Sequence, residues 1–189
     1  MDVYEAIRLR LSTREYLDDA VDPHAVQRIL DAAYAAPSGA NASPWHYVVV
    51  DDMDVRRKIR EMSEAVDSGW NQNMPSWFRR WLDSQQISAE KKFLEQAPCL
   101  IVVFSDNRLP YSVESTWMSI AFAVLAATAE RLATLTYTPG DPSFLSHLLG
   151  TPENLVPQAI LPLGHPAEHP DGSTRPKKPA PRYGRQSQN

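Results

Sequence analysis

The chain has 189 residues, of which 43% are hydrophobic and 22% charged, with a formal net charge of −4. This composition is typical of one globular domain and argues against nucleic acid as the main partner. No apolar run reaches the roughly 18 residues that a membrane helix needs, and the charged residues near the N-terminus are unlike a secretory signal. We therefore expect a cytoplasmic protein with no membrane partner.

The side chains most often used for metal or covalent chemistry show no site-like pattern. Cys99 is the one cysteine, which fits a reducing compartment, and it opens an apolar run at residues 99–104. We expect it to be a small buried residue rather than a nucleophile. The five histidines do not cluster at metal-ligand spacing, so we predict no metal. No glycine-rich dinucleotide or Walker motif is present.

The N-terminal part of the chain predicts two helices. Apolar residues at helical spacing predict an amphipathic helix from about residue 2 to 11. Asp22 and Pro23 predict the start of a second helix, because Asp caps the first turn and Pro is tolerated there. The apolar stripes are Val3, Ala6, Ile7 and Leu11 in the first helix, and Val26, Ile29, Leu30, Ala33 and Tyr34 in the second.

A positively charged cluster, Arg10, Ser12 and Arg14, follows the first helix. A guanidinium can form two parallel hydrogen bonds to a phosphate, and Ser12 adds a neutral donor. A solvated helix end is the alternative, because an arginine there also interacts favourably with the helix dipole.

A segment of small and amide-bearing residues lies between Pro37 and Pro44. Each proline fixes φ and lacks an N–H, so neither a helix nor a paired strand runs through. Ser38, Gly39 and Asn41 would let the backbone approach a flat ligand and hydrogen-bond its edge. Ordinary connecting loops share this composition, so the loop alone leaves both interpretations open.

The rest of the chain predicts alternating strands and helices. The apolar run at 45–50 is expected to be a strand buried on both sides, and 100–104 a second central strand. Two further strands are expected at 133–137 and 159–163. Helices are expected at 54–67, 88–96, 112–132 and from Asp141–Pro142 to Gly150.

Together these motifs resemble the nitroreductase family of FMN-dependent oxidoreductases. Arg-x-Ser-x-Arg at 10–14 and Ala-Pro-Ser-Gly-x-Asn-x-x-Pro-Trp at 36–45 match it in order, spacing and residue type, and shorter matches continue at 97–98, 114–117, 135–139 and 161–166. The resemblance implies an α/β (α+β) fold with a mixed central sheet flanked by helices. It also implies a homodimer, with helix 112–132 at its interface and two FMN molecules between the subunits.

The resemblance also implies which residues bind FMN. Thr138 would lie beside the reactive N5 edge of the flavin, where its hydroxyl would favour one-electron steps, so we expect it to be catalytic; a plain turn is the alternative. The residues expected to bind FMN are Arg10, Leu11, Ser12, Arg14, Pro37, Ser38, Gly39, Asn41, Thr138 and Pro139.

Residues 1–166 are expected to form the FMN-binding domain and 167–189 a basic, proline-rich tail. In the family such a tail commonly returns a basic residue to the FMN phosphate, and Lys177, Lys178 and Arg182 are the candidates here. A disordered solubilising tail is the alternative.

Three of the five tryptophans lie within residues 68–88, which we call the lid. In the family the corresponding insertion often covers the flavin, so we expect Trp70, Met74 and Lys91 to contact an aromatic substrate. Alternatively Trp77, Phe78 and Trp81 form one packed helix face.

The resemblance implies an enzyme that uses NADH or NADPH to reduce nitroaromatic or quinone-like acceptors by a ping-pong mechanism. An alternative is reductive dehalogenation of halotyrosine-like phenols, because 91–104 and 138–139 resemble the iodotyrosine deiodinase branch. In that branch a Glu, a Tyr and a Lys hold the substrate zwitterion; Lys91 matches the Lys, but Val66 and Trp70 stand at the other positions. Glu61, Glu64 or Asp67 would then substitute in a shifted register. A third possibility is a flavin-binding protein with little turnover.

Overall fold

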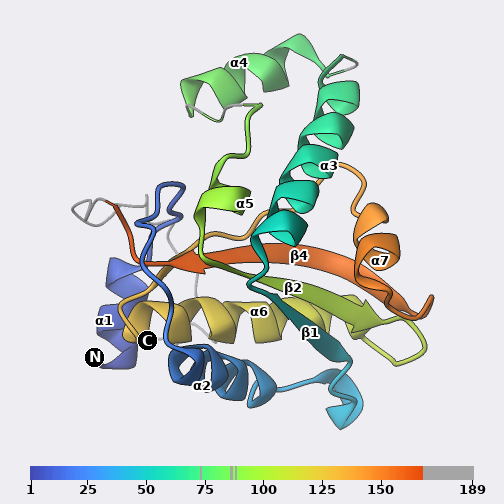
Figure 1. The fold of residues 1–189 in the computed structure, drawn as a ribbon. Coiled ribbons are helices and arrows are strands. Elements are labelled where there is room, and N and C mark those ends of the chain that lie inside the picture. The colour runs from blue at the N-terminus through green and yellow to red at the C-terminus, as the bar shows by residue number, and fades with distance from the viewer. Residues whose placement is uncertain (73, 86, 88, 168–189) are drawn as a thin grey trace, which may run out of the picture.

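The computed structural model describes residues 1–72, 74–85, 87 and 89–167. The predicted tail residues Lys177, Lys178 and Arg182 lie outside this part of the chain, as does Ser88, the first residue of the helix expected at 88–96. The elements in chain order are α1 (Val3–Leu9), α2 (Pro23–Tyr34), the short helix η1 (Gly39–Asn41), β1 (Trp45–Val50), α3 (Met53–Gln72), α4 (Ser76–Ser84), α5 (Phe93–Gln96), β2 (Cys99–Asp106), α6 (Ser112–Ala129), β3 (Ala133–Thr134), α7 (Phe144–Leu149) and β4 (Leu155–Gly164) (Figure 1).

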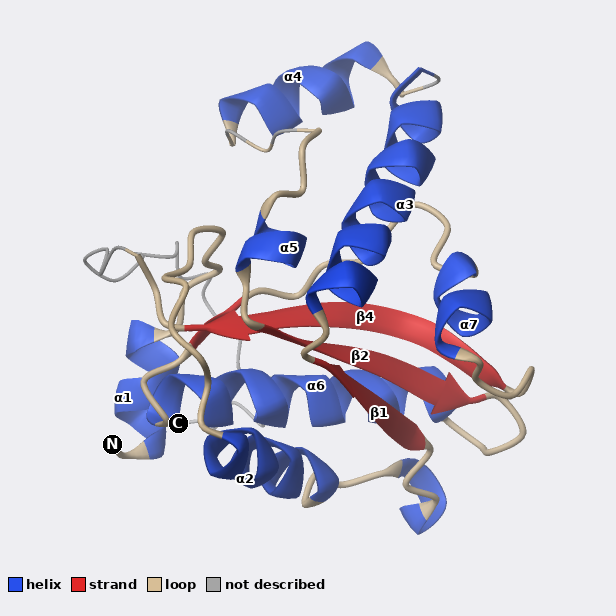
Figure 2. Ribbon diagram, viewed as in Figure 1, coloured by secondary structure: helices blue, strands red, loops and turns tan. Residues whose placement is uncertain are grey.

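The four strands form one antiparallel sheet in the order β1-β2-β4-β3. Ser12 forms a parallel bridge to Thr134 and so attaches the segment after α1 to β3. Helices cover both faces of the sheet: α2 and α6 lie on one, and α3, α5 and α7 on the other (Figure 2). The predicted α/β class, with helices flanking a central sheet, is confirmed.

The core is split between the two faces because the side chains of β2 alternate between them. Leu100, Val102 and Phe104 pack with residues of α3, α5 and α7. Ile101 and Val103 pack with residues of α2 and α6. All eight residues of β2 are buried, as expected for a central strand covered on both sides.

The strand at 45–50 differs from the prediction of a strand buried on both sides. It is the edge strand of the sheet, and His46 and Val49 are exposed. An apolar run of Trp, Tyr and Val favours a strand, but it does not report whether a second neighbour lies beside it.

Several other boundaries also differ. The helix expected at 54–67 continues to Gln72, and the helix expected at 88–96 is limited to Phe93–Gln96. Lys91 N–H donates to Glu64 Oε1 at 2.7 Å, so a side-chain contact takes the place of a helical hydrogen bond. The strand expected at 133–137 pairs only at Ala133–Thr134, and Tyr137 forms a separate bridge to Ile160. The Asp22 cap and the C-terminal Gly150 are confirmed, with Gly150 at φ 65.

Helix α6 is apolar on both its inner and its outer side. It is long and apolar enough to cross a membrane, but the core helix of a globular domain meets the same criteria of length and composition. Its inner side packs in the core through Ile120, Ala123 and Val124. Its outer side exposes Val113, Trp117, Met118 and Phe122. Helix α1 likewise exposes Val3, Tyr4 and Ile7 and buries only Ala6, unlike the amphipathic helix with a buried stripe that its spacing suggests.

Candidate active site

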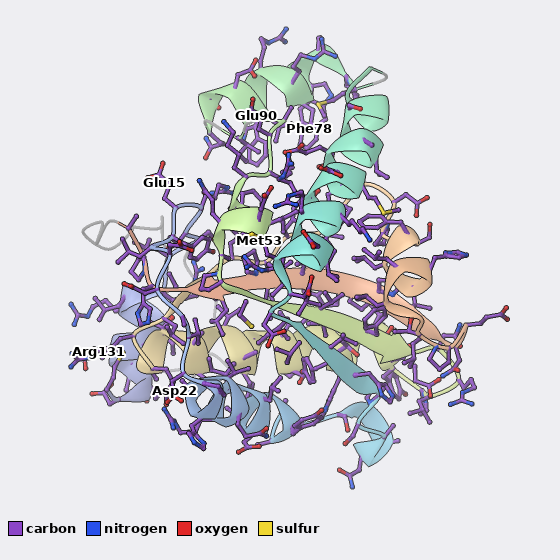
Figure 3. The ribbon with its side chains drawn as sticks, viewed as in Figure 1. Glu15, Asp22, Met53, Phe78, Glu90 and Arg131 are labelled. Atoms are coloured by element: carbon purple, nitrogen blue, oxygen red, sulfur yellow. The ribbon has the colours of Figure 1, made fainter. Side chains whose placement is uncertain are left out.

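A cavity of about 790 Å³ lies between the N-terminal loop, the lid and the segment that follows β3. It brings together four of the predicted site residues, namely Arg14, Met74, Lys91 and Thr138. Figure 3 labels three others on its lining: Glu15 from the N-terminal loop, Phe78 from α4 and Glu90 from the segment before α5. The volume is within the range of about 300–1,000 Å³ typical of small-molecule sites.

The lid supplies an apolar wall of this cavity. Phe78 and Leu82 of α4 line it, together with Met74 and Ile87. Trp77 is 64% exposed and no residue of α4 is buried, so the interpretation of these aromatics as one packed helix face is wrong. Phe78 stacks on the exposed Trp81, with ring centroids 5.7 Å apart, and is the lid aromatic residue that lines the cavity in the described part of the chain.

A charged pair holds the two ends of the lid together. Asp67 of α3 precedes the lid and Lys91 follows it, and Lys91 Nζ lies 3.5 Å from Asp67 Oδ2. Both side chains are largely buried, with 9% and 15% exposure for Lys91 and Asp67. The Lys91 ammonium also lies 5.8 Å from the centre of the Tyr137 ring. A buried charge is costly unless it is paired, so this contact is expected to fix both chain segments.

Asp67 also fixes the turn that carries Thr138. Tyr137 donates its hydroxyl hydrogen to Asp67 Oδ2 at 2.8 Å, and Gly140 N–H donates to Asp67 Oδ1 at 3.0 Å. Burial raises the pKa of Tyr137, and its hydrogen bond to the Asp67 carboxylate raises it further. The phenol therefore stays protonated and continues to donate.

Behind this pair, ion pairs connect α3 to α5. Glu64 accepts from Lys91 N–H and from Arg60 Nη1, the latter at 2.9 Å. Arg60 Nε donates to Glu95 Oε2 at 2.6 Å, and Arg57 Nε donates to the other carboxylate oxygen at 3.2 Å. The hydrogen bond from Arg60 is the main cause that lowers the pKa of Glu95, so this carboxylate is charged at neutral pH.

The Arg10–Arg14 cluster lies where the N-terminal loop meets β3. Thr13 N–H donates to Thr134 O at 3.2 Å, and Arg10 Nη1 lies 3.4 Å from Ser12 Oγ. Neither Arg10 nor Arg14 forms an ion pair with a residue in the described ranges, unlike Arg28, Arg57, Arg60 and Arg108. The cluster therefore keeps two guanidiniums without a carboxylate from the described part of the fold. Leu11 faces a second cavity of about 410 Å³ beside α1.

The Pro37–Asn41 loop has the most unusual backbone of the described chain. Ala40, Asn41 and Ser43 have φ of 53°, 55° and 47°, a region that residues other than glycine rarely adopt. Such outliers persist only where the surrounding structure holds them, and they gather at functional sites. Ser38 Oγ holds the turn by accepting from Ser43 N–H at 3.0 Å. Pro37 and Asn41 are exposed.

Gly39 anchors this loop to the start of α6. Its N–H donates to Ser115 Oγ at 3.0 Å, and a Cβ at this position would lie 2.3 Å from Tyr111 Cδ2. Glycine is therefore required by the Tyr111 ring, whereas the sequence had suggested close approach of a ligand. The 18-residue α6, about 27 Å long at about 1.5 Å per residue, separates this loop from the end of the fold that holds Ser12 and Thr134 (Figure 1).

The remaining predicted residues are placed as follows. Thr138 is exposed, and its hydroxyl donates to Gln158 O at 3.3 Å, whereas Pro139 is buried. Trp70 lies in α3, and its side chain is outside the described part of the structure. Cys99 is buried as predicted, and burial raises the pKa of its thiol to about 12, so it stays protonated and unreactive.

Sequence reasoning did not assign Tyr137 to the site, and it named Asp67 only as a substitute. Tyr137 directly precedes Thr138, which was the available signal. Phe78 belongs to the predicted lid but was not among the residues expected to contact the substrate. The pairing of Asp67 with Lys91 crosses 24 positions of the chain, and no local pattern reports it.

Comparisons with known proteins agree with this architecture. The model of the nitroreductase family matches residues 7–165. An iodotyrosine deiodinase from Thermotoga neapolitana is 32% identical over 87% of this chain and 88% of its own length. A putative NADH dehydrogenase/NAD(P)H nitroreductase from Methanothermobacter thermautotrophicus is 30% identical over 90% of this chain and 80% of its own length.

A solved structure is also similar over the whole chain. It is a crystal structure of oxidized iodotyrosine deiodinase bound to FMN and 3-iodo-L-tyrosine, with a TM-score of 0.85, 30% identity and complete coverage of both chains. The family match spans most of the chain, and the sequence motifs and the fold agree with it. The chain therefore belongs to the nitroreductase family.

Proposed function

We propose that this chain binds FMN and uses it to transfer electrons from NADH or NADPH to a small aromatic acceptor, such as a nitroaromatic compound or a quinone, by a ping-pong route. The observation that carries the proposal is the cavity that brings Arg14, Thr138, Lys91 and Met74 together. Bound FMN would supply the redox chemistry by accepting a hydride from the nicotinamide and passing electrons to the acceptor. The protein supplies binding, orientation and electrostatics.

The residues present fit this cofactor. Arg10 and Arg14 offer two guanidiniums without a described carboxylate partner, and Ser12 adds a hydroxyl, a donor set suited to a phosphate. Thr138, which lines the same cavity as Arg14, presents an exposed hydroxyl on the turn that Asp67 fixes. Phe78 of the lid wall supplies an aromatic ring against which a flat acceptor would stack.

A second copy of the chain would complete the site. The Pro37–Asn41 loop and the Arg10–Arg14 cluster lie at opposite ends of α6 and do not meet within one chain. Two copies related by a two-fold axis across α6 would pack their α6 helices antiparallel. The loop of one copy would then lie near the cluster of the other. The exposed apolar residues of α6 and α1 would be buried in such a dimer.

Reductive dehalogenation is a second candidate. Relatives named iodotyrosine deiodinase support it, and Lys91 lines the cavity. Against it, Val66 of α3 stands at a position where that branch has a residue that holds the substrate zwitterion. Its apolar side chain instead packs against the core. The acids that line the cavity are instead Glu15, Asp67 and Glu90, of which Asp67 pairs with Lys91. A protein that binds flavin with little turnover remains the third candidate.

One experiment separates these functions. The protein is purified without added flavin, its absorbance spectrum is recorded, and NADH or NADPH is added anaerobically. Rapid bleaching of bound flavin, followed by reoxidation with a nitroaromatic or quinone acceptor, is the expected result. Flavin reduced only by dithionite and reoxidised by 3-iodo-L-tyrosine would favour dehalogenation. Flavin that neither nicotinamide reduces and that 3-iodo-L-tyrosine does not reoxidise after dithionite reduction would favour a binding role. A protein that takes up no FMN would contradict the proposal.

A further inference from the structure

The described charged residues that line the active-site cavity are equal in number for the two signs. Among the lining residues that the structure describes, three are cations and three are acids. They are Arg14, Lys91 and Lys92, and Glu15, Asp67 and Glu90. Lys92 Nζ lies 2.8 Å from Glu90 Oε2, with both side chains exposed at the rim. Arg14 is assigned above to the cofactor phosphate, so Lys91 is the cation most able to meet the tail of an acceptor.

Lys91 already has its counter-charge within the protein. Asp67 Oδ2 lies 3.5 Å from its ammonium and also accepts from the Tyr137 hydroxyl, while Asp67 Oδ1 accepts from Gly140 N–H. Asp67 is therefore fixed in place by two hydrogen bonds and cannot swing away without leaving donors unpaired. A ligand carboxylate that approached Lys91 would meet the Asp67 carboxylate at close range. The ligand carboxylate would lose its hydration, and the repulsion from Asp67 would offset most of its attraction to Lys91.

An uncharged aromatic ligand meets no such opposition. The lid wall of Met74, Phe78 and Leu82 offers apolar contact to a ring, and a ring without a charged tail loses little hydration on entry. From this arrangement, and resting on the function proposed above, we infer that the cavity takes aromatic acceptors that carry no net negative charge. Asp67 is the residue that sets this selectivity, because it cancels the charge of Lys91.

The test compares three ligands that share an iodophenol ring. They are 2-iodo-4-methylphenol, which is neutral; 3-(4-hydroxy-3-iodophenyl)propionate, which adds a carboxylate; and 3-iodo-L-tyrosine, which adds a carboxylate and an ammonium. Binding to the oxidised FMN-loaded protein is followed by the change in flavin fluorescence, at a pH where the phenol is protonated. We expect the neutral ligand to bind at least about tenfold more tightly than the propionate, the scale of one hydrogen bond to a charged group.

The Asp67→Asn variant tests the role of this carboxylate. Asparagine keeps the size and an acceptor for Gly140 N–H, but it removes the negative charge. We expect the preference for the neutral ligand to shrink by about tenfold. The double variant Asp67→Asn, Lys91→Gln should restore it, because the gain requires the Lys91 ammonium. Glu15→Gln removes a charge at the exposed rim of the same cavity and should leave the preference near its wild-type value.

Wild-type protein that binds the propionate as tightly as the neutral phenol, or more tightly than 3-iodo-L-tyrosine, whose ammonium can meet the Asp67 carboxylate, would overturn the inference. FMN-loaded protein that binds none of the three ligands would also overturn it. An unchanged preference in Asp67→Asn would overturn the role of Asp67. Flavin content and reduction by NADH or NADPH are measured on the same samples. Protein that holds no flavin, or whose flavin is not reduced by NADH or NADPH, contradicts the proposed function itself. Failure of the proposed function can therefore be told apart from failure of the ligand preference. If Asp67→Asn does not hold FMN, the wild-type ligand series still decides the ligand class.

Discussion

The sheet and the lid are held together by different physical means. Strand β2 is buried along its whole length between two apolar layers. The lid has no buried residue in α4, and its two ends are joined by the Asp67–Lys91 pair and the hydrogen bonds behind it. Apolar packing therefore fixes the scaffold, whereas a few charged contacts fix the wall of the cavity. Substitutions in the two regions should differ in the property that they change.

The largest stability loss is expected in the core. Phe104 is fully buried in β2, so Phe104→Ala should lower the free energy of unfolding by about 3–5 kcal/mol through lost burial and an unfilled cavity. Trp77→Ala, on the exposed side of α4, should change it by about 0.5 kcal/mol or less. Urea denaturation of both variants at one chain concentration makes the comparison. Equal losses would show that the lid is as tightly packed as the sheet.

The next largest effect concerns the cofactor. Arg14→Ala should weaken FMN binding at least about tenfold, because one charge-assisted contact contributes about 1.5–3 kcal/mol. Ser12→Ala should weaken it less, since a neutral hydroxyl donates a weaker hydrogen bond. Arg8→Ala is the matched control, because Arg8 lies in the last turn of α1, outside the cluster. Flavin titration of the apoprotein measures the affinities, and unchanged affinity in Arg14→Ala would sink the assignment of the cluster.

The ion pairs behind the lid should contribute a smaller, pH-dependent stability. Hydrogen bonding from Arg60 holds the pKa of Glu95 below its ordinary value of 4.5. Because the pKa is lower in the folded state, the pair stabilises fully above the unfolded pKa, and its contribution is lost as pH falls through the folded value. Arg60→Gln should cost about 1 kcal/mol at neutral pH and progressively less below about pH 4.5.

Lys92→Gln is the control for that measurement. Its partner Glu90 is exposed, so removing this surface pair should have little effect at any pH. Thermal unfolding between acid and neutral pH follows both variants. A difference between wild type and Arg60→Gln that stays constant with pH would contradict the assigned role of Glu95.

The smallest effect on stability is expected at Thr138. Its hydroxyl is exposed and makes one long hydrogen bond, so Thr138→Ala should change stability by about 0.5 kcal/mol or less. The resemblance to the family predicts that the same change lowers the share of one-electron products formed from a quinone. Product analysis under anaerobic conditions tests this, with Thr136→Ala as a neighbouring control. An unchanged product ratio would leave Thr138 as a turn residue only.

Much of the scaffold was predictable because its signals are local. Apolar runs located β1, β2 and β4, and capping residues located α2 and the end of α7. The edge position of β1 was not predictable, since an apolar run does not identify the neighbours of a strand. The short pairing at Ala133–Thr134 depends on where β4 ends, which the local sequence does not report.

The candidate site was predictable where motifs recorded it. Arg14, Met74, Lys91 and Thr138 were named from the resemblance and lie on one cavity. The pairing of Asp67 with Lys91 and its contact with Gly140 depend on three segments meeting in space. The distance between the Pro37–Asn41 loop and the Arg10–Arg14 cluster could not be predicted either. The two motifs are close in the sequence, but helix α6 separates them in the fold.

A flavin count on a mixed dimer tests this separation most directly. One chain carries Arg14→Ala and the other Asn41→Asp, which tolerates the positive φ of Asn41 but adds a negative charge beside an anionic cofactor. The two are co-expressed with different tags and purified through both. If each site combines the cluster of one copy with the loop of the other, the mixed dimer has one site with both parts intact and one site with both parts altered. We therefore predict about one FMN per mixed dimer, while each variant alone holds little. A mixed dimer without bound FMN would contradict a site built from two chains.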